Sequence, residues 1–311
     1  MPLPRCAAFL CICLSGLFCG PASAQSNRGV DLNEGDRLRS KGDLAGAIRA
    51  YRKVYVYDPG FSGNIYNMAT AFALLGQADS CFYYLYKANS ILPSKDALED
   101  PDLYPVMSDP RWQRFEEGLV QLIVRKNDTL YPDIDYARKL WRIRAADQAY
   151  YWSIAIAEKK SGKQSEAVKK LWTLKQSINE RNQQDLEVLL KSEGWPKISE
   201  VGYHAASAAF LVIQHSDSAL QSKYLPVIHQ LCLEREASWQ WYALMYDRLQ
   251  TDREKPQKYG SQVRYNDTTK KYELFPLEDE ARVDEWRREA GMGPLADYVK
   301  QWDIVFTPKS K

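Results

Sequence analysis

The residues best suited to chemistry lie in the segment Gln214-His215-Ser216-Asp217, directly after an apolar run. An imidazole close to a carboxylate can be held in one tautomer and act as a general base. His215 and Asp217 are two positions apart, so on one helix they would face different ways and could cooperate only if the helix ends near residue 216. The segment therefore predicts either a catalytic pair, His215 and Asp217, or a helix end without chemistry.

Other polar residues could complete a pocket around His215, at a helix end (Asp247-Arg248) and in a loop at residues 259–262. The candidate ligand-binding residues are Gln214, Arg248, Tyr259 and Gln262. Each segment also has a structural interpretation. Asp217 can cap the next helix, Tyr259-Gly260 can form a tight turn, and Asp247-Arg248 can join two helices as an ion pair. Structural, ligand-binding and catalytic roles therefore stay open.

Metal and cofactor chemistry has no support in the sequence. His204 and His215 share a helix face but would lie about 16 Å apart along the axis, too far to bind one metal. No His-x-x-x-His pattern, phosphate loop, dinucleotide fingerprint or nucleophile elbow occurs. The formal net charge of +2 gives no broad attraction to nucleic acid. We expect no metal, no cofactor and no nucleic-acid partner.

The first 24 residues have the features of a signal peptide. Arg5 precedes the apolar stretch CAAFLCICLSGLFCG, and Ala24 ends a small-x-small cleavage site. We therefore expect export to the periplasm or the extracellular space. The bulky Phe18 before Cys19 argues against a lipoprotein. No later stretch reaches the ~18 apolar residues that a membrane span needs, so none is expected in the mature protein.

Most of the cysteines belong to the predicted signal peptide. Four of the six cysteines lie within it, which leaves Cys81 and Cys232. This number excludes a disulfide framework and a Cys-type zinc site. Both residues fall in apolar helical patterns, which favours two buried, unpaired thiols.

A repeat with a step of 34 residues runs through residues 35–93. The matched positions are Gly35/Ala69, Gly42/Gly76, Ala47/Cys81, Tyr51/Leu85, Val54/Ala88 and Pro59/Pro93. Small residues let two helices approach closely, glycine ends the first helix of each pair, and proline stops the second. The pattern resembles two tetratricopeptide repeats, which implies a groove that binds a protein or peptide partner. With a capping helix at about 110–124, this module covers residues 25–124.

The rest of the chain is expected to form a linker and a helical domain. Residues 125–140 are polar, show no sustained helical period and are predicted to be the linker. Residues 141–305 carry amphipathic helical patterns, with Ser199 as the N-cap of a helix that reaches His215. Alternation at residues 263–265 and 272–274 predicts a β-hairpin. The expected fold class is mainly α: tetratricopeptide-like helical hairpins, then an α-helical domain with one small β-hairpin.

Residues 140–302 resemble the bacterial domain of unknown function 6624 family. The matching segments are Asp147-Gln148, Gly194-Trp195-Pro196, Val201-Gly202, Gln214-His215-Ser216-Asp217, Asp247-Arg248, Tyr259-Gly260-Ser261-Gln262, Val283-Asp284, Arg287-Arg288, Gly291, Pro294-Leu295 and Tyr298. The chain departs from the family's usual QHAD and YGTQ forms at Ser216 and Ser261, and Tyr150 stands where arginine is common. The resemblance implies no assigned activity.

Together these patterns predict an exported bacterial tetratricopeptide-like protein that acts as a protein-interaction scaffold. The alternative is a hydrolase, or a small-molecule or glycan-binding protein, with a site centred on His215. Whether the protein is an enzyme is left open. Convergence of His215, Asp217, Tyr259 and Gln262 on an open cleft would favour the alternative, whereas side chains turned into packing would favour the scaffold.

Overall fold

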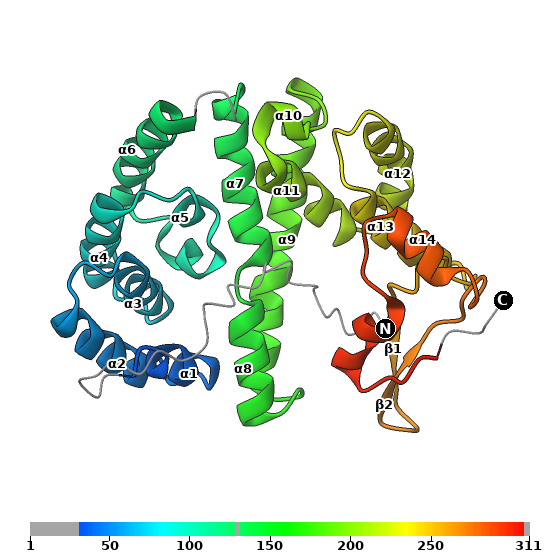
Figure 1. Cartoon of the computed structure of the whole chain (residues 1–311), viewed down its shortest axis with the longest axis horizontal. Coiled ribbons are helices and arrows are strands. Elements are labelled where there is room, and N and C mark those ends of the chain that lie inside the picture. The colour runs from blue at the N-terminus through cyan, green and yellow to red at the C-terminus, as the bar shows by residue number, and fades with distance from the viewer. Residues whose placement is uncertain (1–30, 128–130, 308–311) are drawn as a thin grey trace. The chain divides into compact units, whose positions relative to one another are not determined.

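The computed structural model describes residues 31–127 and 131–307, so the predicted signal peptide at 1–24 lies outside the described residues. Within these limits the chain forms two compact units. The N-terminal unit comprises residues 31–196 and 200–208, and the C-terminal unit comprises residues 197–199 and 209–307. Both are built mainly from helices (Figure 1).

Two helical hairpins open the N-terminal unit. Their helices are α1 (Glu34–Ser40), α2 (Leu44–Tyr57), α3 (Ser62–Leu74) and α4 (Ala78–Ile91). Gly42 and Gly76 have φ values of 73° and 69°, a left-handed conformation that turns the chain between paired helices and that glycine adopts at little cost. A Cβ atom on Gly35 would overlap the Tyr51 ring, which explains the small residue there. The 34-residue step therefore corresponds to two successive hairpins.

A short acidic segment covers one side of these hairpins. Its elements are α5 (Asp96–Glu99) and η1 (Pro101–Val106), which also contact α7 (Ile134–Gln148). Tyr66 on α3 donates a hydrogen bond of 2.7 Å from Oη to Asp100, and Arg39 on α1 forms an ion pair with Asp102. Figure 1 shows α5 between α3 and α7. The chain's own segment thus occupies the side from which Arg39 and Tyr66 project.

Further helices complete the N-terminal unit. They are α6 (Pro110–Asn127), α8 (Tyr151–Ser161) and α9 (Glu166–Ser192). Residues 125–140, expected to be an irregular linker, are mostly helical, because α6 extends to residue 127 and α7 begins at residue 134. Asp133 caps α7 by accepting the Tyr136 N–H at 2.9 Å, and Tyr136, Ala137, Leu140 and Trp141 are buried. These buried residues have helical spacing. Too few of them lie within residues 125–140 for the sequence to show a helical period there.

The small-residue helix that the sequence predicts as one piece is divided at Gly202. The two pieces are α10 (Ile198–Val201) and α11 (Tyr203–Gln214). Gly202 has a φ of 78°, and a Cβ atom there would come within 2.6 Å of the Tyr131 ring. Ser199 therefore does not cap α11. Its N–H and Oγ donate to the Glu236 carboxylate at 2.9 and 2.7 Å. The boundary between the two units falls inside α11, after residue 208.

The C-terminal unit combines helices with a single hairpin among its described residues. Its elements are α12 (Ser218–Leu233), α13 (Trp239–Asp252), β1 (Val263–Asn266), β2 (Lys271–Leu274), α14 (Val283–Glu289), α15 (Leu295–Val299) and η3 (Lys300–Trp302). The strands are antiparallel and form the predicted β-hairpin, with Val263 opposite Leu274. In the core, Phe210 stacks on Trp241 at 5.7 Å. The predicted fold class, mainly α with one small β-hairpin, is confirmed.

Both cysteines of the described chain are buried and form no disulfide, as predicted. Burial raises the pKa of the Cys81 and Cys232 thiols to about 12. Across the described helices, none combines the length and apolar character required to cross a membrane.

Candidate functional site

The segment at residues 214–217 makes the turn from α11 into α12. Asp217 is the N-cap of α12, and its Oδ1 atom accepts the Leu220 N–H at 2.8 Å. Ser216 donates from Oγ to the Ile213 carbonyl at 2.6 Å. The helix end that cooperation between His215 and Asp217 requires is therefore present, but the Asp217 carboxylate already serves as a helix cap.

Two side chains meet at the backbone carbonyl of Gln214. Arg248 on α13 donates to it from Nη1 at 3.1 Å, and Gln221 on α12 donates from Nε2 at 3.2 Å. These bonds satisfy a carbonyl that a helix end leaves without an intrahelical partner. The Oε1 atoms of Gln214 and Gln221 are buried and accept no hydrogen bond within the described residues. They are acceptors that this region could offer to a ligand.

Asp247, the neighbour of Arg248 on α13, binds the second predicted segment. It is fully buried, and its carboxylate accepts the backbone N–H groups of Lys258 at 2.8 Å, Tyr259 at 3.0 Å and Ser261 at 2.9 Å. Burial raises the pKa of this carboxyl, and the three hydrogen bonds oppose that shift. Adjacent residues of one helix thus connect residue 214 with the loop at 258–261, so the predicted segments gather in the C-terminal unit.

The loop that contains Tyr259 is held from other sides as well. The buried Arg287 on α14 donates from Nη1 to the Tyr259 carbonyl at 2.7 Å, and Tyr298 donates from Oη to the Ser261 carbonyl at 2.9 Å. Gly260 has a φ of 66°, and a Cβ atom there would come within 2.8 Å of a leucine side chain on α15. These contacts hold the loop backbone in one conformation.

The side chains of Tyr259 and Gln262 contribute to packing and local bonding. Tyr259 belongs to a buried apolar cluster with Trp286 and two alanines. Gln262 donates from Nε2 to the Oγ atom of the adjacent Ser261 at 3.0 Å. Both candidate ligand-binding side chains therefore stabilise their own loop.

The N-terminal unit contains a histidine–carboxylate pair that the sequence did not reveal. The Nδ1 atom of His204 on α11 lies 2.7 Å from Oε1 of Glu99 on α5. Because an ionised carboxylate can only accept, Nδ1 carries the proton of this bond. The Glu99 side chain is 5% exposed, whereas that of His204 is 47% exposed. The pair holds an accessible imidazole in one tautomer, the arrangement that a general base requires.

Positive charges keep Glu99 ionised. The Nζ atom of Lys95 lies 2.7 Å from Oε1, and Nη1 of Arg144 lies 3.7 Å from Oε2. Burial alone would raise the pKa of Glu99, but the hydrogen bond with His204 and these two cations lower it below its usual value. Glu99 and His204 are 105 positions apart in the chain, so no local pattern could have joined them.

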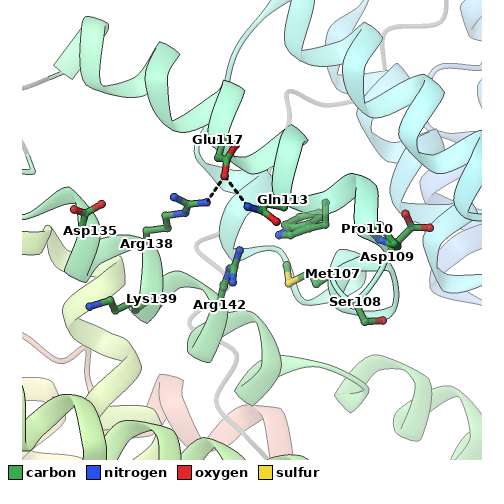
Figure 2. A pocket seen from close by; sticks show the side chains of 11 residues that line it. Met107, Ser108, Asp109, Pro110, Gln113, Glu117, Asp135, Arg138, Lys139 and Arg142 are labelled. Atoms are coloured by element: carbon green, nitrogen blue, oxygen red, sulfur yellow. Dashed lines mark hydrogen bonds and ion pairs between the residues drawn. The ribbon is translucent and has the colours of Figure 1, made fainter.

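A groove of about 730 Å³ lies beside η1, α6 and α7 in the N-terminal unit (Figure 2). Its charged lining residues are Asp109, Glu117, Asp135, Arg138, Lys139 and Arg142. Figure 2 shows Arg138 and Gln113 directed at Glu117. The buried Glu116 binds Arg138 at 2.8 Å and also binds Arg142. Because the lining charges balance, the groove shows no preference for a ligand of one sign.

The described residues contain no group of side chains that could bind a metal ion. Within residues 31–127 and 131–307, no three His, Cys, Asp or Glu side chains gather closely enough to hold an ion. The histidines have separate surroundings: His204 binds Glu99, and the His229 ring lies 5.1 Å from that of Tyr242. The residues present there therefore offer no candidate metal centre.

Comparison with known proteins relates the C-terminal part of the chain to a family. The model of a family of unknown function, DUF6624, matches residues 133–311, which confirms the resemblance seen for residues 140–302. Comparison with curated proteins and with solved structures gave no match. The matched region includes His204 and the segments at 214–217 and 258–262, whereas Glu99 lies outside it.

Proposed function

We propose that this chain, which belongs to the family of unknown function DUF6624, is an exported bacterial protein-interaction scaffold. Its tetratricopeptide-like hairpins would dock a partner protein. The single observation that carries the proposal is that residues of the predicted site stabilise the fold. Asp217 caps a helix, Asp247 holds three backbone N–H groups, and Tyr259 packs in an apolar cluster.

The hairpins display the apolar surface that a docking site needs. Half of the large hydrophobic side chains exposed in the described residues lie between residues 56 and 92. Tyr83 and Tyr86, which are 60% and 46% exposed, are three positions apart and share one face of α4. Exposed apolar side chains that share a face are a feature of binding surfaces. Since the chain's own acidic segment already binds Arg39 and Tyr66, we place the partner on α2 and α4 rather than in the groove predicted for the repeats.

Site-specific photo-cross-linking in cells that naturally make the protein tests this proposal. A benzoylphenylalanine probe in place of Tyr86 should give a defined cross-linked product. The same probe in place of Val188, an apolar residue on α9 that is 65% exposed, should give none. Adding Val56→Ser and Tyr83→Ser should abolish the product without lowering the melting temperature. Equal products from both probe positions would contradict the proposal.

The export part of the proposal has its own test. The leader-like residues 1–24 support it, and N-terminal sequencing of the mature protein should begin at Gln25. Retention of those residues, or a lipid on Cys19, would show that this part is wrong.

A hydrolase, or a small-molecule or glycan-binding protein, centred on His215 is the second candidate. The buried Oε1 atoms of Gln214 and Gln221 favour it, because they accept no hydrogen bond in the described chain. Native mass spectrometry of the wild type and of His215→Ala separates the two functions. A variant that folds normally and loses a bound small molecule would support the second candidate. A variant that only loses stability would support the scaffold.

A further inference from the structure

A strip of tyrosine and basic side chains crosses α2 and α4 in the N-terminal unit. We call it the tyrosine strip, and its members are Arg52, Tyr55, Tyr83, Tyr84 and Lys87. The Tyr84 ring stacks on the buried Phe72 ring at 5.6 Å, with 3° between the planes. The rings of Tyr55 and Tyr83 meet Tyr84 edge-on, at 6.0 and 4.9 Å. Aromatic pairs in these geometries fix one another's orientation, so the strip is preorganised.

The two cations of the strip lie over aromatic rings. Nζ of Lys87 is 4.9 Å from the Tyr55 ring centre and 6.0 Å from that of Tyr83. Cζ of Arg52 is 5.7 Å from the centre of the Phe72 ring. Such contacts position a cation but leave its charge uncompensated, because the ring carries no net charge.

No carboxylate on these helices neutralises the strip. Helix α2 contains basic residues and no acidic residue. The acidic residue of α4, Asp79, pairs with Arg111 at 2.7 Å. Neither Arg52 nor Lys87 takes part in an ion pair within residues 31–127 and 131–307. The strip therefore presents aromatic rings together with uncompensated positive charge.

The same unit shows how tyrosine and basic side chains bind carboxylates. On the side covered by the chain's own segment, Tyr66 donates from Oη to Asp100 at 2.7 Å, and Arg39 forms an ion pair with Asp102. Hydrogen bonds that involve an ionised group are roughly twice as strong as neutral ones. The segment held in this way, residues 98–106, has the sequence LEDPDLYPV.

We infer that the tyrosine strip binds an acidic segment of the partner protein. This inference rests on the proposed scaffold function and names the class of its partner. Carboxylates of that segment would bind Arg52 and Lys87, and its proline or apolar residues would cover the exposed Tyr83 ring. Opposite charge on the two surfaces speeds association and selects against basic partners, and salt screens it.

Fluorescence anisotropy with a defined peptide tests the inference. The probe is LEDPDLYPV carrying a zwitterionic rhodamine, and the control is LQNPNLYPV, in which amides replace the three carboxylates. The acidic probe should bind the purified protein at least about tenfold more tightly than the amide probe. Raising the salt concentration from about 0.05 M to about 0.5 M should weaken binding of the acidic probe only.

Variants locate the binding. Arg52→Ala/Lys87→Ala should weaken binding of the acidic probe at least about tenfold. Tyr83→Ala, which truncates an exposed ring, should weaken it with the circular dichroism spectrum unchanged. The matched control, Lys170→Ala/Lys191→Ala, removes the same charge from α9 and should change the affinity less than about twofold.

Three outcomes would overturn the inference. The first is a missing difference in affinity, either between the two probes or between the wild type and Arg52→Ala/Lys87→Ala. The second is loss of binding in Arg39→Ala alone, which would place the probe on the side already covered by residues 98–106. The third is a dimer that dissociates in Arg52→Ala/Lys87→Ala, which would make a second copy of the chain the occupant. A cross-linked product at Tyr86 that persists when the acidic probe fails would leave the scaffold proposal standing, so the two failures are distinguishable.

Discussion

Replacing the buried carboxylate of Asp247 should destabilise the C-terminal unit. In Asp247→Asn, Oδ1 can still accept from Lys258 and Tyr259, but an amide NH₂ would face the Ser261 N–H, which Oδ2 accepts at 2.9 Å. A buried donor left without a partner costs about 1–3 kcal/mol, and a neutral acceptor also weakens the two remaining bonds. We therefore expect the free energy of unfolding to fall by about 2–4 kcal/mol.

Two further variants should lose more and less stability, respectively, than Asp247→Asn. Asp247→Ala removes the acceptor group of all three N–H donors and should cost about 4 kcal/mol or more, a large part of the about 5–15 kcal/mol that stabilises an ordinary domain. Asp252→Asn changes an exposed carboxylate on the same helix and should shift the stability by less than about 0.5 kcal/mol.

Urea unfolding measured by tryptophan fluorescence, with amide hydrogen exchange at residues 258–261, checks these values. Exchange at these amides should speed up in Asp247→Asn and stay unchanged in Asp252→Asn, because only Asp247 accepts their hydrogen bonds. If both asparagine variants lose the same stability, the carboxylate does not hold the loop and the reasoning is refuted.

Backbone geometry and burial set the remaining expected outcomes. Gly260→Ala should lower the free energy of unfolding by about 1–2 kcal/mol, because φ there is 66°. Gly118→Ala should raise it by up to about 1 kcal/mol, because the new Cβ would meet no atom within 4 Å outside its own stretch of helix. Thermal unfolding measures both values, and equal shifts would contradict this reasoning. The lowered pKa of Glu99 means that its stabilisation is present above the unfolded-state pKa of about 4.3 and is lost as pH falls through the folded-state pKa. Glu99→Gln should therefore flatten the acid side of the stability–pH curve, and an unchanged curve would count against the ion pair. Cys81 and Cys232, with pKa values of about 12, should react with a thiol reagent at pH 8 only after unfolding, so fast labelling of the native protein would disprove their burial.

Elements set by neighbouring residues were predictable from the sequence. Gly42 and Gly76 adopt the left-handed conformation that ends the first helix of each hairpin, and Val263 and Leu274 face each other in the predicted β-hairpin. These features depend on backbone preferences within a few residues, so a pattern in the sequence reports them directly. The division at Gly202 was missed, because a glycine inside a helical pattern does not show whether its φ will be positive.

The sequence predicted which segments belong to the candidate site, but not what their side chains do. The sequence singled out the segments around Asp217, Arg248 and Tyr259, and the structure connects the last two to Gln214 through one helix, α13. Only the tertiary structure shows that Asp247 accepts three backbone N–H groups, because those donors lie 11 to 14 positions further along the chain. These residue types are equally suited to lining a cleft, so the hydrogen bonds that Asp247 makes could be known only from the folded unit.

The sequence by itself determined the helical class, the hairpins and the family, because these follow from helical periodicity, a repeat of 34 residues and short family segments. The tertiary structure alone brought Glu99 to His204 across 105 positions, and it placed Asp100 against α3 and Asp102 against α1. Contacts between distant segments depend on how whole elements pack. A local sequence pattern does not show which elements will come into contact.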